Sequence, residues 1–199
     1  MTEDPDAAAP VEDQSTPDTV MLLIDPAWEA TDEAPEPPVS ALLGVWALTE
    51  AGDRGRFQSN PVYQPITADS PLDPVDAVLR LLARDDQDQA LPASMLESVL
   101  RDVTLSIALN EQGAALVRPA PDGVPSVLVT TAAGHSRRLA VPGWRALTVE
   151  QLAEALPARG VDVLLNPGAP ASMRVLADVI RRAAEGADDS AVDDGDPAS

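Results

Sequence analysis

The chain has 199 residues, with 13 basic and 33 acidic side chains, one histidine and no cysteine, which gives a formal net charge of −20. All the basic residues are arginine. A chain this acidic repels nucleic-acid phosphate and anionic lipid, because binding to either needs clustered positive charge. The absence of cysteine excludes disulfides, thiol nucleophiles and zinc–thiolate sites.

The acidic charge is concentrated at the two ends. Residues 1–40 hold 11 acids and residues 183–199 hold six, with no arginine in either segment, whereas residues 41–182 hold 16 acids and all 13 arginines. Residues 1–18 and 187–199 are rich in Asp, Glu, Pro, Ala and Ser, so we expect both to be disordered. They serve solubility or, alternatively, dock on a basic partner.

The amino terminus carries no recognisable targeting signal. It begins Met-Thr-Glu-Asp-Pro and lacks the basic and apolar regions of a signal peptide. No segment approaches the run of about 18 apolar residues that a membrane span needs. The sequence therefore predicts a cytoplasmic protein without membrane insertion.

The first elements are strands. Residues 20–24 form a short apolar run, which we expect to be an edge strand that docks on the body. The proline-rich residues 34–38 act as a stiff spacer. A second apolar run at 39–48 is followed by turn-forming residues, which indicates a hairpin into residues 55–57. An extended, loop-rich stretch follows to about residue 72.

Two helices come next. Asp73 is placed to cap a helix that begins at Pro74, with Asp76 near the positive end of its dipole. The apolar residues of this helix recur at helical spacing and predict one buried face: Val75, Val78, Leu79 and Leu82. A second, short helix begins near Pro92.

Three strands are predicted after the helices. Apolar and polar residues alternate over residues 103–109, which indicates a half-buried strand. Turn-forming residues at 110–113 and 119–123 separate it from strands at 115–117 and 124–131. The last of these is apolar enough to be a central strand covered on both faces. The three strands follow one another as a meander.

The carboxy-terminal part adds a helix, a strand and another helix. Thr148 and Gln151 form a capping box that begins a helix ending at Pro157. Residues 161–165 are a strand, and we expect the turn at 166–170 to lead directly into the last helix. The residues assigned to the buried face of that helix are Met173, Leu176, Ala177 and Ile180.

Together these elements predict an α+β fold with a mixed or antiparallel sheet, a three-strand meander and three to four helices. The folded domain is expected to span residues 41–182. A partly ordered, proline-rich lead-in at 19–40 precedes it, and the acidic tails lie outside it.

His135 is the only histidine, which excludes a metal site with two histidine ligands. No Gly-x-Ser-x-Gly elbow supports a Ser–His–Asp triad. We therefore expect His135 to be an exposed loop residue, and we predict no catalytic residue and no cofactor. The acidic run at Asp85, Asp86 and Asp88 lacks the spacing of an EF-hand and is read as a solvated loop, not a metal site.

Three arginines form a local positive cluster beside a tryptophan. Arg137, Arg138 and Arg145 pair with a partner's carboxylates in one interpretation, with Trp144 as an aromatic anchor. In the other interpretation, the arginines balance neighbouring acids on the protein's own surface.

Residues 165–173 offer a possible anion site. Asn166, Gly168 and Ser172 lie where a helix is expected to begin, and free backbone N–H groups at a helix start attract anions. However, Pro167 and Pro170 remove two donors, so the segment also fits a rigid strand-to-helix corner.

Several motifs together resemble a known family. They are Pro-Asp-Gly within residues 116–131, Pro-Gly-Trp-Arg at 142–145 and Asn-Pro-Gly within 161–173, with Gly-Val-Trp at 44–46 and Asn-Pro-Val-Tyr at 60–63 upstream. Their order and spacing resemble the actinomycete proteins called type VII secretion system-associated proteins. The carboxy-terminal half is similar to the SseB (enhanced serine sensitivity) domain.

The resemblance implies an SseB-like domain in a non-catalytic accessory protein of a type VII secretion locus, which binds a protein partner such as a secretion-system component. The chain does not look like cargo of that pathway. Cargo carries Trp-x-Gly and Tyr-x-x-x-Asp/Glu signals, but no tryptophan here has glycine two residues later, and Tyr63 is followed by Thr67. The alternative is a small-ligand or anion sensor that uses the Asn-Pro-Gly helix start.

Overall fold

The computed structural model describes residues 19–49, 52, 54–83 and 90–185. The predictions for the two acidic tails and for the run at Asp85, Asp86 and Asp88 therefore lie outside the described residues. No helix in the described ranges is long and apolar enough to cross a membrane.

The first layer is a three-stranded antiparallel sheet of β1 (Val20–Ile24), β2 (Leu42–Leu48) and β3 (Arg54–Ser59), with β2 in the centre. A short 3-10 helix (Val39–Ala41) leads into β2. The predicted edge strand and hairpin are thus confirmed. Gly44 is required where β2 meets β3, because a Cβ atom there would lie 2.2 Å from the ring of Phe57.

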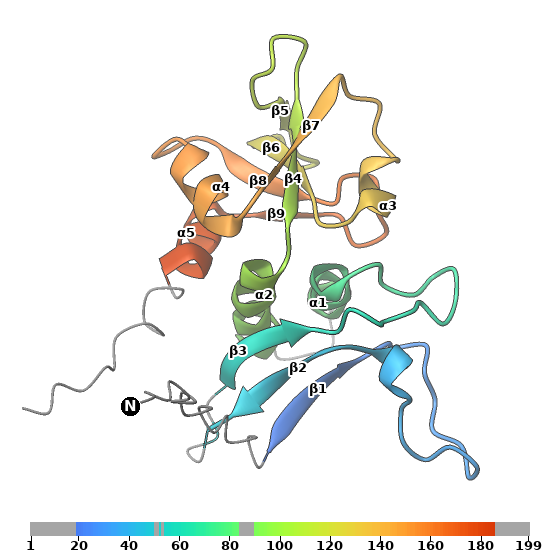
Figure 1. Cartoon of the computed structure of the whole chain (residues 1–199). Coiled ribbons are helices and arrows are strands. Elements are labelled where there is room, and N and C mark those ends of the chain that lie inside the picture. Colours follow the sequence, from blue (N-terminus) through green and yellow to red (C-terminus); the bar gives the residue numbers. More distant parts are fainter. Residues whose placement is uncertain (1–18, 50–51, 53, 84–89, 186–199) are drawn as a thin grey trace, which may run out of the picture.

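Two helices, α1 (Pro74–Leu82) and α2 (Ala90–Asp102), form the middle layer above this sheet (Figure 1). The predicted cap of α1 is confirmed, since the Asp76 amide donates to Oδ1 of Asp73 at 2.9 Å. The indole of Trp46 in β2 donates to the Ser98 hydroxyl of α2 at 2.9 Å. The first sheet is therefore bonded to the helices as well as packed against them.

The second sheet lies on the other side of the helices (Figure 1). Its order is β7 (Gly143–Leu147), β4 (Leu105–Leu109), β6 (Pro125–Thr130), β8 (Asp162–Leu165) and β9 (Met173–Val175). Only β6 and β8 are parallel to each other. β5 (Val117–Pro119) has three residues and pairs with one end of β6, so β6 also pairs directly with β4.

Three further helices complete the described part of the chain: α3 (Ala133–Ser136), α4 (Val149–Ala155) and α5 (Ala177–Glu185). The predicted capping box of α4 is present. The α+β class is confirmed, with β6 in the centre of a mixed sheet. The single turn α3 occupies a segment that was expected to be a loop.

The prediction for the last helix was wrong at its start. Residues 166–170 do not lead into a helix, because the chain reverses there and Met173–Val175 pairs antiparallel with β8 as strand β9. The reversal uses positive φ angles at Asn166 (47°) and Gly168 (78°). The helix begins only at Ala177, and Leu176 is 53% exposed instead of lying on a buried face.

One hydrophobic core joins all the layers. It runs from Leu23 of β1 through Leu79 of α1 and Val99 of α2 to Val129 of β6. The lead-in at 19–40 therefore contributes to the same core as the predicted domain. A smaller cluster of Ala108, Ala120, Leu128 and Leu164 lies on the opposite face of the second sheet.

Candidate functional site

A cluster of buried polar side chains lies where the parallel strands β6 and β8 end. In open α/β sheets, ligands often bind at the carboxyl ends of parallel strands. Two of the side chains come from the start of α1, one follows β6, one lies on α3 and one follows β8. These residues, all buried, are Asp73, Asp76, Thr131, His135 and Asn166.

Asp73 connects α1 to the second sheet. One carboxylate oxygen caps the helix, and the other accepts a hydrogen bond from the Thr131 hydroxyl at 2.6 Å. Burial raises the pKa of the Asp73 carboxyl above its ordinary value, although these hydrogen bonds act in the opposite direction. Local sequence predicted the cap, but the contact with Thr131 spans 58 residues and had no local signal.

Asn166 joins the ends of β6 and β8. Its Oδ1 accepts from the Thr131 amide at 3.0 Å, and its Nδ2 donates to the Thr131 hydroxyl at 2.9 Å. Its own amide donates to the Val129 carbonyl at 2.8 Å. Asparagine tolerates the left-handed backbone conformation found here better than most residues do. Asn166 therefore fastens the two strand ends to each other.

The predicted anion site is not formed. Asn166 points inward to Thr131, whereas Gly168 and Ser172 are exposed. The helix start that should have attracted the anion is absent, because Ser172 leads into β9. The segment is a corner, as in the alternative interpretation, but it connects strand β8 to strand β9 instead of connecting a strand to a helix.

The Asp76 carboxylate is fully engaged. It accepts from the Leu72 amide at 3.0 Å and from the Arg80 guanidinium at 3.1 Å. Arg80 also donates to the carbonyl of Asp69. This carboxylate is thus neutralised by a cation one helical turn away, which offsets part of the cost of burying it.

His135 is buried, so the expectation of an exposed loop histidine was wrong. Its side chain is 1% exposed, and neither ring nitrogen has a hydrogen-bond partner among the described residues. Its Nε2 lies 3.6 Å from Oδ2 of Asp76 and 3.8 Å from Oδ2 of Asp73. Burial lowers the pKa of His135 below its ordinary value, against the opposing attraction of the two carboxylates.

Tight packing explains why α3 turns His135 inward. A Cβ atom on Gly134 would lie 2.5 Å from Cδ1 of Leu72, so α3 rests directly on the segment before α1. Small residues precede the histidine at Ala132, Ala133 and Gly134. That run of small, uncharged residues was the one local signal that His135 is not in a solvated loop.

The cluster places a buried imidazole beside two buried carboxylates. Among the described residues, no hydroxyl is hydrogen-bonded to the His135 ring. Within the ranges that the structure describes, no three His, Asp or Glu side chains are placed to hold a metal ion.

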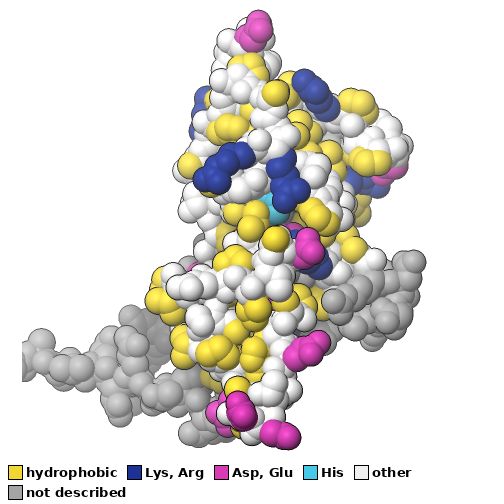
Figure 2. All heavy atoms as spheres, turned by 90° about the vertical axis from the view of Figure 1, so that its right-hand side faces the viewer, with side chains coloured by type: hydrophobic (Ala, Val, Ile, Leu, Met, Phe, Trp, Pro, Cys, Tyr) yellow, Lys and Arg dark blue, Asp and Glu magenta, His cyan; other side chains and the backbone are white. Residues whose placement is uncertain are grey.

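The predicted arginines lie on the surface above this cluster. Arg137 and Arg138 follow α3, and Arg145 lies on β7; all three are exposed. None of them forms an ion pair with a described carboxylate, and Arg145 reaches only the Gly113 carbonyl, at 3.3 Å. Figure 2 shows arginine side chains gathered on this half of the molecule around the histidine.

Trp144 does not join these arginines. Neighbouring residues of a strand point to opposite faces of the sheet. Trp144 packs against the small cluster around Leu128, whereas Arg145 pairs across the sheet with Ile107 of the main core. The four predicted residues therefore do not form one patch. We use the name arginine face for the exposed side chains of these three arginines, Arg137 and Arg138 after α3 and Arg145 on β7.

A separate hollow of about 220 Å³ lies beside the start of α5, lined in part by Arg159, Asp162, Leu176 and Arg181. Arg181 is already occupied there by Asp178 at 2.7 Å and by the Pro157 carbonyl. The hollow is therefore a partly neutralised surface depression.

A scan against known protein families, a search of curated proteins and a search of solved structures found no match to this chain.

Proposed function

We propose that this protein is a non-catalytic accessory protein of a type VII secretion locus, which acts in the cytoplasm by binding a protein partner at the arginine face. The observation that carries the proposal is the state of Arg137 and Arg138, which are exposed and have no described carboxylate partner in a chain of net charge −20. Guanidinium groups left free in this way are suited to bidentate pairing with carboxylates of another molecule.

The contrast with other arginines supports this interpretation. Arg174 pairs with Asp122 and Asp162, both at 2.6 Å, and Arg182 pairs with Glu97 at 2.8 Å. Acids thus neutralise some of the other surface arginines, although Arg118 is also exposed without an ion pair to a described carboxylate. Arg137, Arg138 and Arg145 form no such ion pair with a described carboxylate, which leaves their charge available to an acidic partner.

The neighbouring strand offers a second means of contact. β7 is an edge strand of the second sheet, and one side of an edge strand has unpaired backbone N–H and C=O groups. A partner segment that adds a strand to β7 would pass Arg145. The partner we propose is therefore a protein with an extended acidic segment.

Affinity purification of the full-length protein from its native host tests the proposal. Under low-salt conditions we expect type VII secretion components to be recovered with it, and recovery to fall as the salt concentration rises. Recovery of no secretion component would contradict the assignment to that locus.

A further inference from the structure

A second surface, on the segments that flank β2 and β3 of the first sheet, carries exposed apolar side chains. Val39 is 63% exposed, Val62 is 55% exposed and Ile66 is 45% exposed. They come from two segments that lie side by side, because the Gln64 amide donates to the Ser40 carbonyl at 2.9 Å. We call these three residues the valine patch.

Hydrogen bonds hold both segments of the valine patch in place. The side-chain amide of Asn60 donates to the carbonyls of Val39 and Leu42 at 2.7 and 2.8 Å, and its Oδ1 accepts from the Val62 amide at 3.2 Å. One asparagine thus bridges the two segments. The exposed valines are presented by a fixed backbone, which lowers the entropy cost of binding.

Asp25 holds in place the segment that carries Ile66, the third residue of the valine patch. Its buried carboxylate accepts from the Tyr63 hydroxyl at 2.9 Å and from the amides of Ile66 and Ala27 at 3.2 and 2.9 Å. The segment of residues 63–66 is therefore tied to the end of β1. Prolines at 61 and 65 restrict the same segment further.

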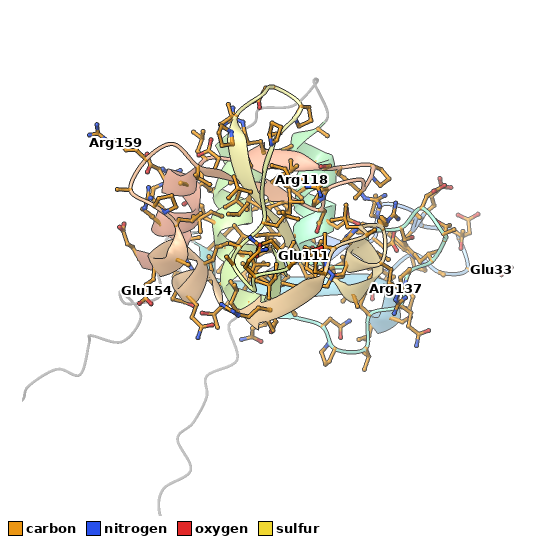
Figure 3. The ribbon with its side chains drawn as sticks, turned by 90° about the horizontal axis from the view of Figure 1, so that it is seen from above. Glu33, Glu111, Arg118, Arg137, Glu154 and Arg159 are labelled. Atoms are coloured by element: carbon orange, nitrogen blue, oxygen red, sulfur yellow. The ribbon has the colours of Figure 1, made fainter. Side chains whose placement is uncertain are left out.

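The surroundings of the patch are acidic. The loop between β1 and the 3-10 helix exposes four carboxylates that form no ion pair with a described residue: Glu29, Asp32, Glu33 and Glu36. Residues 19–49 contain no arginine to neutralise them. Figure 3 shows Glu33 projecting outward from its loop.

We infer that the valine patch is a second docking surface, which takes an amphipathic segment of another protein with apolar side chains flanked by lysine or arginine. The exposed apolar patch requires an apolar contact. The unpaired carboxylates around it select a basic segment and exclude an acidic one. Such a partner differs in charge from the partner of the arginine face, so this inference does not depend on the proposed function.

Binding of a synthetic peptide to the full-length protein tests the inference. The probe is a fluorescent, helical peptide of about four turns, made of leucine and lysine with leucine at positions i, i+3, i+4 and i+7. Two control peptides replace lysine by glutamate or leucine by serine. The lysine–serine peptide measures how much of the binding comes from charge attraction alone, including attraction to the acidic tails. Fluorescence anisotropy at about 150 mM salt gives the dissociation constants.

The matched variants are V39S/V62S/I66S and V117S. Val117 is exposed to the same extent as Ile66, at 45%, but lies on β5. We expect the triple variant to weaken binding of the leucine–lysine peptide about tenfold or more and V117S to leave it unchanged. A second variant, E29Q/D32N/E33Q/E36Q, should weaken binding and reduce its salt dependence. Circular dichroism checks that each variant is folded.

Three results would overturn the inference. The first is equal affinity of the peptide for the triple variant and V117S. The second is equal binding of the leucine–glutamate or lysine–serine peptide. The third is a dimer in light scattering that dissociates in the triple variant, since a second copy of the chain would then be the occupant.

Discussion

Nε2 of His135 lies 3.6 Å from Oδ2 of Asp76, and the two groups form no hydrogen bond although both are buried. The carboxylate is already occupied by the Leu72 amide and by Arg80. The imidazole is therefore held as a neutral group beside a neutralised carboxylate. Adding a proton to His135 would place a desolvated charge inside the fold, which the carboxylates of Asp73 and Asp76 offset only in part.

Acid should destabilise the protein through His135. Because its pKa is lowered in the folded state, the unfolded chain binds more protons near its unfolded value of about 6.5, and the free energy of unfolding decreases as the pH falls through that value. H135L should remove this decrease. Its stability at pH 7 should stay within about 1.5 kcal/mol of wild type, because no hydrogen bond of the ring is lost.

Urea denaturation at pH 7, 6 and 5 measures both quantities. Asp73 acts in the opposite direction, because its raised pKa makes stability increase as the pH falls toward its unfolded value. Its carboxylate lies 3.8 Å from the His135 ring, so the comparison of H135L with the wild type reports the histidine together with its effect on Asp73. An unchanged pH dependence in H135L would show that the histidine is not the group responsible.

The two helix N-caps, Asp73 and Thr148, should contribute different amounts to the free energy of unfolding. D73A removes a cap and also the acceptor of the buried Thr131 hydroxyl, so we expect a loss of about 2–4 kcal/mol. T148A removes an exposed cap alone and should cost about 1 kcal/mol. Chemical denaturation compares the variants, and equal losses would contradict the role assigned to the buried cluster.

Gly44 should tolerate no side chain. G44A places a methyl group against Phe57 and the Gln58 carbonyl, at 2.2 and 2.4 Å before relaxation, and should destabilise the protein by about 2–3 kcal/mol. G55A is the control in the neighbouring strand, where the closest atom is the Ala47 carbonyl oxygen at 3.3 Å. A melting temperature for G44A equal to that of G55A would contradict the packing described for the first sheet.

Elements determined by neighbouring residues could be predicted from the sequence. The caps at Asp73 and Thr148 depend on residues within one helical turn, and both are present. The last helix was misplaced because Met173, Leu176, Ala177 and Ile180 have helical spacing, whereas Met173–Val175 pairs with β8. A three-residue strand leaves too little periodicity to distinguish the two.

The candidate site was harder to predict because its contacts are long-range. The burial of His135 depends on Leu72 and on α1, which lie about sixty residues earlier in the chain. Likewise, the sequence could not show which acids lie near Arg137 and Arg138. Of the two interpretations considered, neutralisation by neighbouring acids is not supported in the described part of the chain, and partner binding stays a prediction.

The most direct test of the central claim compares R137A/R138A/R145A with R118A in affinity purification from the native host. Arg118 is also exposed and has no ion pair with a described carboxylate, and it lies over β5 away from Arg137 (Figure 3). Quantitative mass spectrometry should show an approximately tenfold or greater loss of secretion components with the triple variant and wild-type recovery with R118A. Equal recovery with the two variants would contradict a partner-binding role for the arginine face.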